Sequence, residues 1–336
     1  MIARRTFLKA VGAAVALPFP AGRVRAADGP FRIHMLLWRG ETEVEQGFRT
    51  YLAEHQVPVE LVVRDCNRDL GRLPDFLAEI RTDRPDLVYT WGTGITLGTV
   101  GRWDAPKEAQ PIRDIPVVFA LVSAPVATGI APPDGHPARA NVTGAVHVPP
   151  IPVQIAAMQA YLPLRRIAVI FNPAEQNSVS NVAQLRMAAG AVGVEVLEAP
   201  VPDGPDGKPD ATSIPRLVAE LARRLPQLLY IGPDNFVGNH RDELTAAGIA
   251  HGLPCFTATE LEVRDGDAMF GLVSRYDMVG RLAGLKAKQI LVDGMAPSEL
   301  PIETLDRFSF VIRLPVALRL GLYPPLPLLD YAEIIR

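Results

Sequence analysis

The polar residues best suited to bind a ligand lie in two loops of the second half of the sequence. Each loop follows a short apolar segment, and the candidates are Asn172, Asn177 and Ser178 in the first loop and Asp234 and Asn235 in the second. Side-chain amides and hydroxyls exchange hydrogen bonds with carbonyl or anionic groups, and a carboxylate accepts them from an ammonium group. These residue types predict recognition of a small polar or charged molecule. Capping of the helix that follows each loop is an alternative role for Asn177, Ser178 and Asp234.

A second set of candidates, with aromatic, cationic or small side chains, follows apolar segments in the first half: Trp38, Arg39, Trp91, Gly92, Thr93, Ser123 and Ala124. An indole stacks on an apolar body, and a guanidinium group binds a carboxylate through two parallel hydrogen bonds. Glycine lets a ligand approach backbone N–H groups. The alternative is an indole on the surface at position 38 and an ion pair of Arg39 with Glu41 or Glu43. Tyr276, further along the chain, either covers a ligand or packs at a hinge.

The sequence lacks the usual signatures of an enzyme or a metal site. Its six histidines are scattered, and no pair has metal-ligand spacing with a third ligand nearby. No Cys-x-x-Cys, His-Glu-x-x-His, Gly-x-Ser-x-Gly or phosphate-binding loop occurs. The segment GTGITLG (92–98) has a weak likeness to a dinucleotide fingerprint, but it follows a third strand and lacks an acidic partner. We therefore expect no cofactor, no metal and no catalysis.

A regular alternation of strands and helices positions the candidate residues in the first half of the chain. Apolar segments predict strands over 31–37, 57–65, 85–91 and 115–122, and the spacing of apolar residues predicts helices over 41–55 and 70–83 and a third that starts at 94. This β-α-β order predicts a parallel sheet covered by helices.

The alternation restarts in the second half of the chain. Strands are predicted over 165–171, 194–201, 226–232, 253–258 and 267–274, and helices over 178–193, 213–225 and 236–252. A stretch rich in Pro and Gly, 142–154, separates the halves and is interpreted as a crossover.

The predicted fold class is therefore α/β, with two Rossmann-like lobes, each a parallel sheet flanked by helices, joined by a hinge. In open parallel sheets, ligands lie beyond the carboxyl ends of the strands. Two such lobes that face one another bring these strand ends to one cleft. All the candidate residues are expected at that cleft.

Residues 1–26 have the pattern of an export signal and are not expected to belong to the fold. Arg4 and Arg5 precede a mildly apolar stretch of the right length for a signal core, as in a twin-arginine signal, and cleavage is expected after Ala26. A basic amphipathic helix at a membrane surface is the alternative. The signal contains no cysteine for a lipid anchor. We expect a soluble periplasmic protein that is not lipid-anchored.

The composition fits a globular protein with two domains. Of 336 residues, 48% are hydrophobic, which is enough for a full core and argues against a disordered chain. Removal of residues 1–26 takes away five basic residues and no acidic one, so the formal net charge changes from -3 to -8. An acidic chain without a basic cluster disfavours nucleic-acid binding. Cys66 and Cys255 fall in different halves, so we expect two reduced, buried thiols.

Six stretches occur in an order and spacing typical of one protein family. They are NPAEQNSV after the strand 165–171, DIPVVFALVSAPVATGI (114–130), NVTGAVHVPPIPVQIAAMQAYLP (141–163), LLYIGPDNFV (228–237), GLVSRYDMVGRLAGLKAKQILVDGMAPSELPIE (271–303) and FSFVIRLPVALRLGL (308–322). Together they resemble the tryptophan/tyrosine-type substrate-binding proteins of ABC transporters, which have the periplasmic-binding-protein type I fold. The likeness covers most of residues 30–323.

The resemblance implies a receptor that captures a small molecule by hinge closure and presents it to an ABC permease in the inner membrane. Trp38, Arg39 and Glu41 after the first strand, and Phe236 in the second-half loop, depart from the family pattern in the presumed cleft, so an aromatic amino acid is not carried over as the ligand. The expected ligand is a small molecule with a carboxylate and an apolar or aromatic body, such as an amino acid or an aromatic or apolar carboxylate. The periplasmic ligand-binding component of a sensor kinase system is an alternative function. A cofactor enzyme exported in folded form is a further alternative. A monomer is expected.

The expected division of the chain follows from the restart of the pattern and from the resemblance. Lobe 1 takes 30–146 plus 274–308, lobe 2 takes 150–272 plus 310–336, and the hinge segments lie near 146–152, 272–275 and 308–311.

Overall fold

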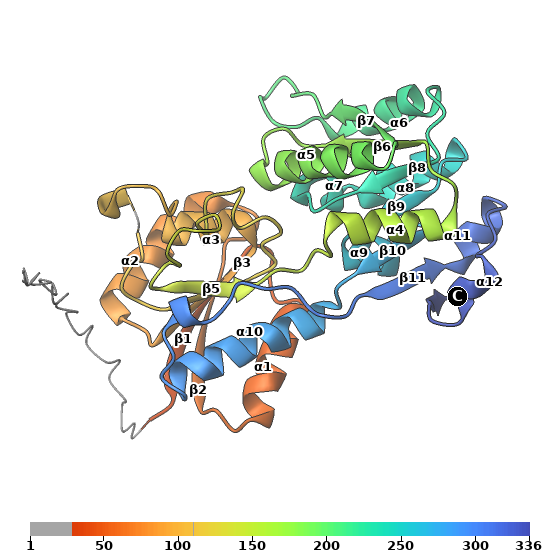
Figure 1. Cartoon of the computed structure of the whole chain (residues 1–336). Coiled ribbons are helices and arrows are strands. Elements are labelled where there is room, and N and C mark those ends of the chain that lie inside the picture. The colour runs from red at the N-terminus through yellow and green to blue at the C-terminus, as the bar shows by residue number, and fades with distance from the viewer. Residues whose placement is uncertain (1–28, 110) are drawn as a thin grey trace, which may run out of the picture.

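The computed structural model describes residues 29–109 and 111–336, so the expected signal over 1–26 lies outside the described residues. The described chain forms two α/β lobes, each built on one sheet (Figure 1). Lobe 1 contains a five-stranded sheet and lobe 2 a seven-stranded sheet, and helices flank both. The predicted fold class is confirmed.

The sheet of lobe 1 is parallel throughout and has the strand order β2-β1-β3-β4-β5. Its strands are β1 Phe31–Leu37, β2 Val59–Asp65, β3 Leu87–Trp91, β4 Val117–Ala120 and β5 Val142–Ala145. Neighbouring residues of β1 point to opposite faces, and both Met35 and Leu36 are fully buried. Helices therefore cover both faces, which explains why the central strands β3 and β4 are buried at every position.

Two helices pack on each face of the lobe 1 sheet. One face is covered by α1 (Glu43–Glu54) and by α10 (Tyr276–Leu291), which returns from far along the chain. The other face is covered by α2 (Leu73–Asp83) and α3 (Gly92–Val100). Short 3-10 turns lie at Leu70–Arg72, Lys107–Ala109 and Pro297–Glu299.

The sheet of lobe 2 has the order β12-β11-β10-β9-β8-β6-β7, and its one antiparallel pair among the described strands is β10 with β11. Its strands are β6 Arg166–Phe171, β7 Glu195–Pro200, β8 Leu228–Ile231, β9 Cys255–Thr257, β10 Phe270–Val273, β11 Ser309–Arg313 and β12 Glu333–Ile335.

Helices flank the lobe 2 sheet on both faces as well. One face packs against α4 (Ile151–Tyr161), α5 (Gln176–Ala191) and α11 (Leu314–Arg319). The other packs against α6 (Ile214–Ala222), α8 (Arg241–Ala250) and α9 (Glu260–Arg264). The shorter elements are α7 Asn235–Asn239, α12 Leu326–Leu329 and a 3-10 turn at Ala211–Ser213.

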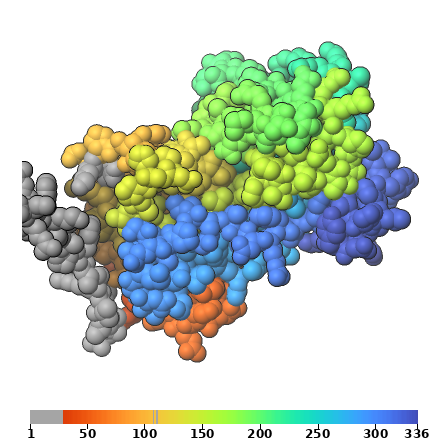
Figure 2. All heavy atoms as spheres, viewed as in Figure 1, coloured from red at the N-terminus to blue at the C-terminus, as the bar shows by residue number. Residues whose placement is uncertain are grey.

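The chain crosses between the lobes three times. The first crossing runs from β5 to α4, the second consists of Ser274 and Arg275 between β10 and α10, and the third leads to β11. This exchange places blue C-terminal segments on both lobes in Figure 2. Before the third crossing, the buried Lys286 ammonium donates to Glu303, which also bridges to Ala145 at the sheet edge. Where the lobes bend relative to one another stays a prediction, because a single structure shows one arrangement.

The described structure differs from the sequence-based elements in three places. The crossover predicted over 142–154 is shorter, because β5 occupies 142–145 and α4 begins at Ile151. The helix predicted over 236–252 is two helices, α7 and α8, which meet at His240. The Pro-rich tail forms the short helix α12 over Leu326–Leu329, and its end forms β12, which pairs in parallel with β11. The tail therefore completes the edge of the lobe 2 sheet.

Two further expectations concern the cysteines and the membrane. Cys66 and Cys255 are free and buried in different lobes, as predicted. Within residues 29–109 and 111–336, the helices are all too short or too polar to cross a bilayer.

The return helix α10 touches α1 through glycines. An added Cβ at Gly280 would lie 1.8 Å from the Val44 carbonyl oxygen, and one at Gly47 would lie 2.0 Å from the Asp277 carbonyl oxygen. Backbone therefore packs directly on backbone, and no side chain fits between the two helices. This contact fixes the start of α10 against lobe 1 immediately after the chain leaves lobe 2.

We predict that Gly280→Ala lowers the free energy of unfolding by more than about 2 kcal/mol, because a methyl group there must displace a helix backbone. Urea denaturation measures the change. Gly190→Ala is the matched control, because Gly190 is also helical and an added Cβ there has nothing within 4 Å. The control should be neutral or stabilise by up to about 1 kcal/mol. Equal effects of the two substitutions would contradict the packing argument.

Candidate ligand-binding site

The candidate residues meet at a cleft between the lobes, beyond the carboxyl ends of strands from both sheets. The cleft encloses a polar cavity of about 50 Å³, lined by Arg39, Trp91, Gly92, Thr93, Leu121, Ser123, His147, Asn177, Pro233, Asp234, Asn235, Gly238, Thr259, Leu261, Glu262 and Tyr276. A cavity of this volume holds only a few water molecules. The two walls therefore nearly meet at this point.

A larger apolar cavity, of about 400 Å³, adjoins the polar cavity. The two share Trp91, Gly92, Thr93, Asn177 and Asn235. Apolar side chains, among them Trp38, Leu70, Ile95 and Leu97, form much of its lining. Volumes of this order are typical of small-molecule sites. The cleft thus combines a narrow polar part with a wider apolar part.

Arg39 and Trp91 form the cationic part of the lobe 1 wall. The Arg39 guanidinium carbon lies 5.3 Å from the centroid of the Trp91 ring, which is cation–π geometry. The alternative ion pair with Glu41 is not found, because Glu41 binds Arg49. Among the described residues, Arg39 has no ion-pair partner. Its charge is therefore available to an anionic ligand group.

Several buried polar atoms around the cleft lack a hydrogen-bond partner among the described residues. They include Nε1 of Trp38, Nε1 of Trp91 and Nδ1 of His147. A buried donor or acceptor without a partner costs about 1–3 kcal/mol. Unpaired groups of this kind gathered around one cavity are expected where a ligand or ordered water supplies the missing partners.

His147 and Tyr276 close the cleft near the crossings. Burial lowers the pKa of His147 to about 3, so its imidazole is neutral at physiological pH. Its ring meets the Tyr276 ring edge-on, with centroids 6.1 Å apart. The Tyr276 backbone N–H donates to the Glu260 carboxylate at 2.5 Å, which anchors the start of α10 to lobe 2. Tyr276 therefore lines the cavity and also packs at a crossing.

Asp234 organises the lobe 2 wall. Its Oδ2 accepts hydrogen bonds from the Asn172 backbone N–H at 2.7 Å and from the Ser178 hydroxyl at 2.6 Å. Its Oδ1 accepts from the Val237 N–H at 2.8 Å and so caps α7. Burial and the nearby Glu175 carboxylate raise the pKa of Asp234 to about 6, and its three donors oppose this rise. The carboxylate is thus occupied by the protein itself, as the capping alternative predicts.

Glu175 links the same two loops from the other side. Its carboxylate accepts hydrogen bonds from the backbone N–H groups of Asn235 and Phe236, both at 2.9 Å, and from the Asn172 amide at 3.2 Å. Seven donors from the chain, four of them backbone N–H groups, therefore converge on Glu175 and Asp234. The two carboxylates fix the position of residues 172–178 relative to residues 234–237.

The start of α5 corrects one expectation. The helix begins at Gln176 with Glu175 as its N-cap, so Asn177 and Ser178 lie inside the first turn and do not cap it. The Asn177 amide instead donates to the Pro233 carbonyl at 2.8 Å. Gln176 donates from Nε2 to the Ala127 carbonyl of lobe 1 at 3.1 Å, which is a direct contact across the cleft.

Glu262 is the second acid that lines the polar cavity. It is 6% exposed, and its carboxylate accepts from the Thr259 hydroxyl at 2.6 Å. Burial raises its pKa, while this hydrogen bond and the positive charges of Arg241 and Arg39 oppose the rise. Glu262 therefore provides an acidic group in the cavity that Arg39 also lines.

The predicted residues fall into three groups in the structure. Nine of them line the polar cavity and Trp38 lines the adjoining apolar cavity; the nine are Arg39, Trp91, Gly92, Thr93, Ser123, Asn177, Asp234, Asn235 and Tyr276. Ala124 lines a separate small cavity that it shares with Ser123. Asn172 and Ser178 are buried behind the wall and support it through Asp234. The direct contact of each with a ligand stays a prediction.

Sequence reasoning missed His147, Glu175 and Glu262. His147 follows β5, and assignment of that strand would have placed it beyond a strand end. Glu262 lies three residues after Thr259, a spacing typical of a helix start that gives no sign of a cavity. Glu175 lies within the loop that was singled out, but a single acid in a loop is usually solvated.

Comparison with known proteins identifies relatives of this architecture. The family model of ABC transporter substrate binding proteins matches residues 40–335. No curated protein sequence matches the chain.

Two solved structures have a TM-score of 0.76 to this chain. A Streptococcus pneumonia protein in complex with L-Trp is 19% identical and covers 91% of this chain and 100% of its own. A conserved domain protein from Vibrio cholerae is 20% identical, with 91% and 99% covered. A ligand-free, open substrate-binding protein with adhesive properties from Clostridium difficile has a TM-score of 0.69 at 19% identity, with 91% and 99% covered. At sequence identities this low, the likeness to these structures shows a shared fold alone.

We predict that Ser178→Ala destabilises the protein by about 1.5–3 kcal/mol at pH 7.5, because it removes a donor to a buried carboxylate. The pKa of Asp234 lies above its ordinary value of 3.8. Loss of the donor raises this pKa further. The loss in free energy of unfolding is largest above the folded-state pKa, and it becomes smaller as Asp234 is protonated below about pH 6. Urea denaturation at pH 7.5 and pH 5.0 measures both values.

The control for this prediction is Ser180→Ala, two residues further along the same helix. It should change stability by less than about 0.5 kcal/mol at either pH, as most substitutions away from buried networks do. A cost of Ser178→Ala that is the same at both pH values would refute the assigned hydrogen bond to an ionised carboxylate.

Proposed function

The chain belongs to the family of ABC transporter substrate-binding proteins, and we propose that it is the exported receptor of an uptake transporter, with an amino acid or an aromatic or apolar carboxylate as its ligand. The family is one of solute-binding proteins and not of enzymes, in agreement with the expectation of no catalysis. The two lobes with a cleft between them have the Venus-flytrap architecture of such receptors.

The observation that supports this ligand class is that a guanidinium group without an ion-pair partner among the described residues lies next to an apolar cavity. Arg39 lines the narrow polar cavity without an ion-pair partner among the described residues. The apolar cavity beside it is about 400 Å³ and is lined in part by Trp38 and Leu70. A ligand carboxylate would bind Arg39, and an apolar or aromatic body would fill the wider space against the indoles.

An amino-acid ligand also requires a partner for its ammonium group. Asp234 was the sequence-based candidate, but its two oxygens already accept three hydrogen bonds from the protein. Glu262 is better suited, because it lines the polar cavity and its one close donor is the Thr259 hydroxyl. The Streptococcus pneumonia structure with bound L-Trp supports an amino acid as the first compound to test.

Capture by hinge closure follows from where the site lies. Arg39 and Trp91 belong to lobe 1, whereas Asn177 and Glu262 belong to lobe 2, so a ligand that contacts both sets stabilises the closed arrangement. The Gln176 bond to Ala127 adds a direct link between the lobes when they are close. The closed form would then be the one presented to a permease in the inner membrane.

We predict that the purified protein is stabilised by aromatic or apolar amino acids or carboxylates, and that Arg39→Gln weakens their binding about 10- to 150-fold. This range corresponds to the about 1.5–3 kcal/mol of a hydrogen bond to a charged group. Thermal denaturation over a panel of amino acids, aromatic acids, purines and sugars identifies the ligand, and isothermal titration measures Kd. A ligand at 100 times its Kd adds about 2.7 kcal/mol of stability.

Arg113→Gln is the matched control, because Arg113 is an exposed lobe 1 arginine that lines neither cavity. Its variant should bind with unchanged Kd. If Arg39→Gln also left Kd unchanged, the carboxylate would not be bound at Arg39. If purines or sugars alone stabilised the protein, the proposed ligand class would be wrong.

We predict that replacement of both Arg4 and Arg5 by lysine retains the protein in the cytoplasm with its first residues uncleaved. The paired arginines are the feature on which the export proposal depends. Fractionation of cells and mass measurement of the purified protein give the location and the new N-terminus. Arg23→Lys, close to the expected cleavage site, is the control and should be exported. Normal export of the double variant would exclude the twin-arginine route.

A further inference from the structure

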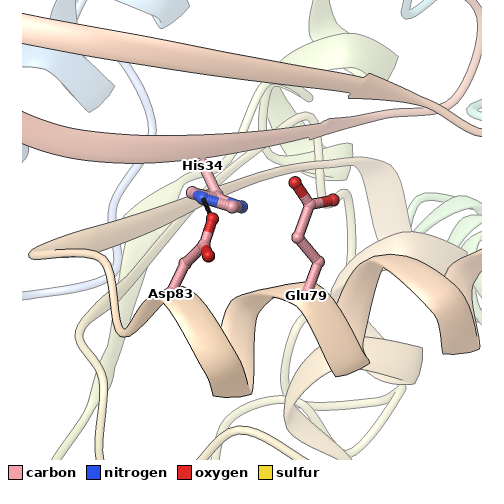
Figure 3. Close-up of side chains that lie close together, drawn as sticks. All are labelled: His34, Glu79 and Asp83. Carbon is pink, nitrogen blue, oxygen red and sulfur yellow. Dashed lines mark ion pairs between the residues drawn. The ribbon is translucent and has the colours of Figure 1, made fainter.

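Three side chains on the flank of lobe 1 gather around one point outside the cleft. His34 comes from the middle of β1, and Glu79 and Asp83 come from α2, one helical turn apart (Figure 3). One ligand atom from each, an imidazole nitrogen and two carboxylate oxygens, lies within 4.8 Å of the other two. None of the three lines the polar or the apolar cavity. The cluster is therefore separate from the candidate ligand site.

The imidazole of His34 is the unusual member of this cluster. The residue is 0% exposed, and neither ring nitrogen has a hydrogen-bond partner among the described residues. Its Nε2 lies 3.3 Å from Oδ2 of Asp83, in a geometry that does not make a hydrogen bond. The buried imidazole is thus left without a hydrogen-bond partner on the side that faces the carboxylate, which is costly unless a third group lies between them.

The charges at this place favour a cation. Asp83 is the last residue of α2, where the helix dipole is negative and a carboxylate is disfavoured. The carboxylates of Glu79 and Asp83 both lie close to the His34 ring. The remaining charges that face His34 are those of Arg64 and Arg32, and Arg32 is directed to Glu60.

The separation of one pair of ligand atoms fits a small divalent metal. Two ligands each about 2.0–2.1 Å from Zn²⁺ at a tetrahedral angle lie roughly 3.4 Å apart. The distance between Nε2 of His34 and Oδ2 of Asp83 is 3.3 Å. One imidazole and two carboxylates are ligands that Zn²⁺ accepts, and the half-exposed carboxylates leave room for water as a fourth ligand.

We propose that His34, Glu79 and Asp83 bind one divalent transition-metal ion of the Zn²⁺ class. The ion joins the C-terminal turn of α2 to the central part of β1. Because it binds the folded chain and not the unfolded one, it stabilises lobe 1 by mass action. Motif reading does not find this site, because the histidine and the two acids are far apart in the sequence.

Arg64 shares Glu79 with the proposed metal. Its guanidinium group forms a forked ion pair with the Glu79 carboxylate, with one contact of 2.7 Å from Nε. A carboxylate has acceptor positions for more than two partners, so a metal on the His34 side and Arg64 on the other side are compatible. Glu79 should therefore contribute less to affinity than Asp83, which faces the imidazole directly.

The test measures Zn²⁺ binding to the full chain after treatment with a chelator. Isothermal titration should show one Zn²⁺ per chain, and thermal denaturation should show a higher Tm with Zn²⁺. Asp83→Asn should weaken Zn²⁺ binding at least tenfold, and Glu79→Gln should weaken it less. Asp75→Asn, an exposed acid two turns earlier on α2, is the matched control and should leave Kd unchanged.

Co²⁺ gives a second readout through its visible absorption, which reports coordination number and nitrogen ligation. An intense spectrum that is lost in Asp83→Asn supports the site. His34 is buried, so His34→Gln can fail to fold, and the two carboxylate variants keep the test decisive. The proposal is overturned if Zn²⁺ does not bind, or if it binds with the same Kd to Asp83→Asn, because the ion would then lie on other surface groups.

Discussion

The direct backbone contact between α10 and α1 is the constraint on which the cleft depends. α10 begins with Tyr276, only two residues after β10 of lobe 2 ends, and it packs along its length on lobe 1. Gly47 and Gly280 allow the helices to meet without side chains between them. The Tyr276 N–H is meanwhile bound to Glu260 of lobe 2. One residue in the cleft is therefore positioned by both lobes at once.

The lobe 2 wall depends on a different interaction: buried carboxylates accept hydrogen bonds from backbone N–H groups. Asp234 and Glu175 together accept hydrogen bonds from two loops that follow two different strands. Asn177, Asn235 and Glu262 are among the polar side chains that line the cavity from lobe 2. Residues that hold the loops in place and residues that line the cavity are therefore neighbours in the lobe 2 wall.

Much of the fold could be predicted from the sequence, because parallel strands buried on both faces are apolar runs that stand out between amphipathic helices. β1 over 31–37 is an example, and its bounds agree with the structure. β5 could not be recognised, since it is four residues long and lies next to prolines that favour a loop. The break at His240 was hidden because the apolar spacing continues across it.

The candidate site could be predicted to the level of strand ends but not to the level of individual roles. Position after a strand brought Arg39, Trp91 and Asn177 to the cleft, because topology alone determines that edge. Loop conformation decides whether a polar side chain lines the cavity or instead forms a hydrogen bond with a backbone N–H group. This conformation is not predicted from a single sequence. Ser178 is the clearest case, since its hydroxyl donates to the Asp234 carboxylate and it does not line the cavity.

The three crossings also have a consequence for the order in which the chain can fold. Lobe 1 ends its first run at β5 and is completed only when α10 returns from residue 276, so everything from 146 to 275 forms a loop that must be closed. Closure of a long flexible loop costs entropy and slows the pairing of its ends. That loop contains most of the lobe 2 sheet, from β6 to β10. Once this part is compact, its two ends lie near one another, and the remaining closure is short. The architecture that joins the lobes at a cleft thus makes the completion of lobe 1 depend on the prior collapse of lobe 2.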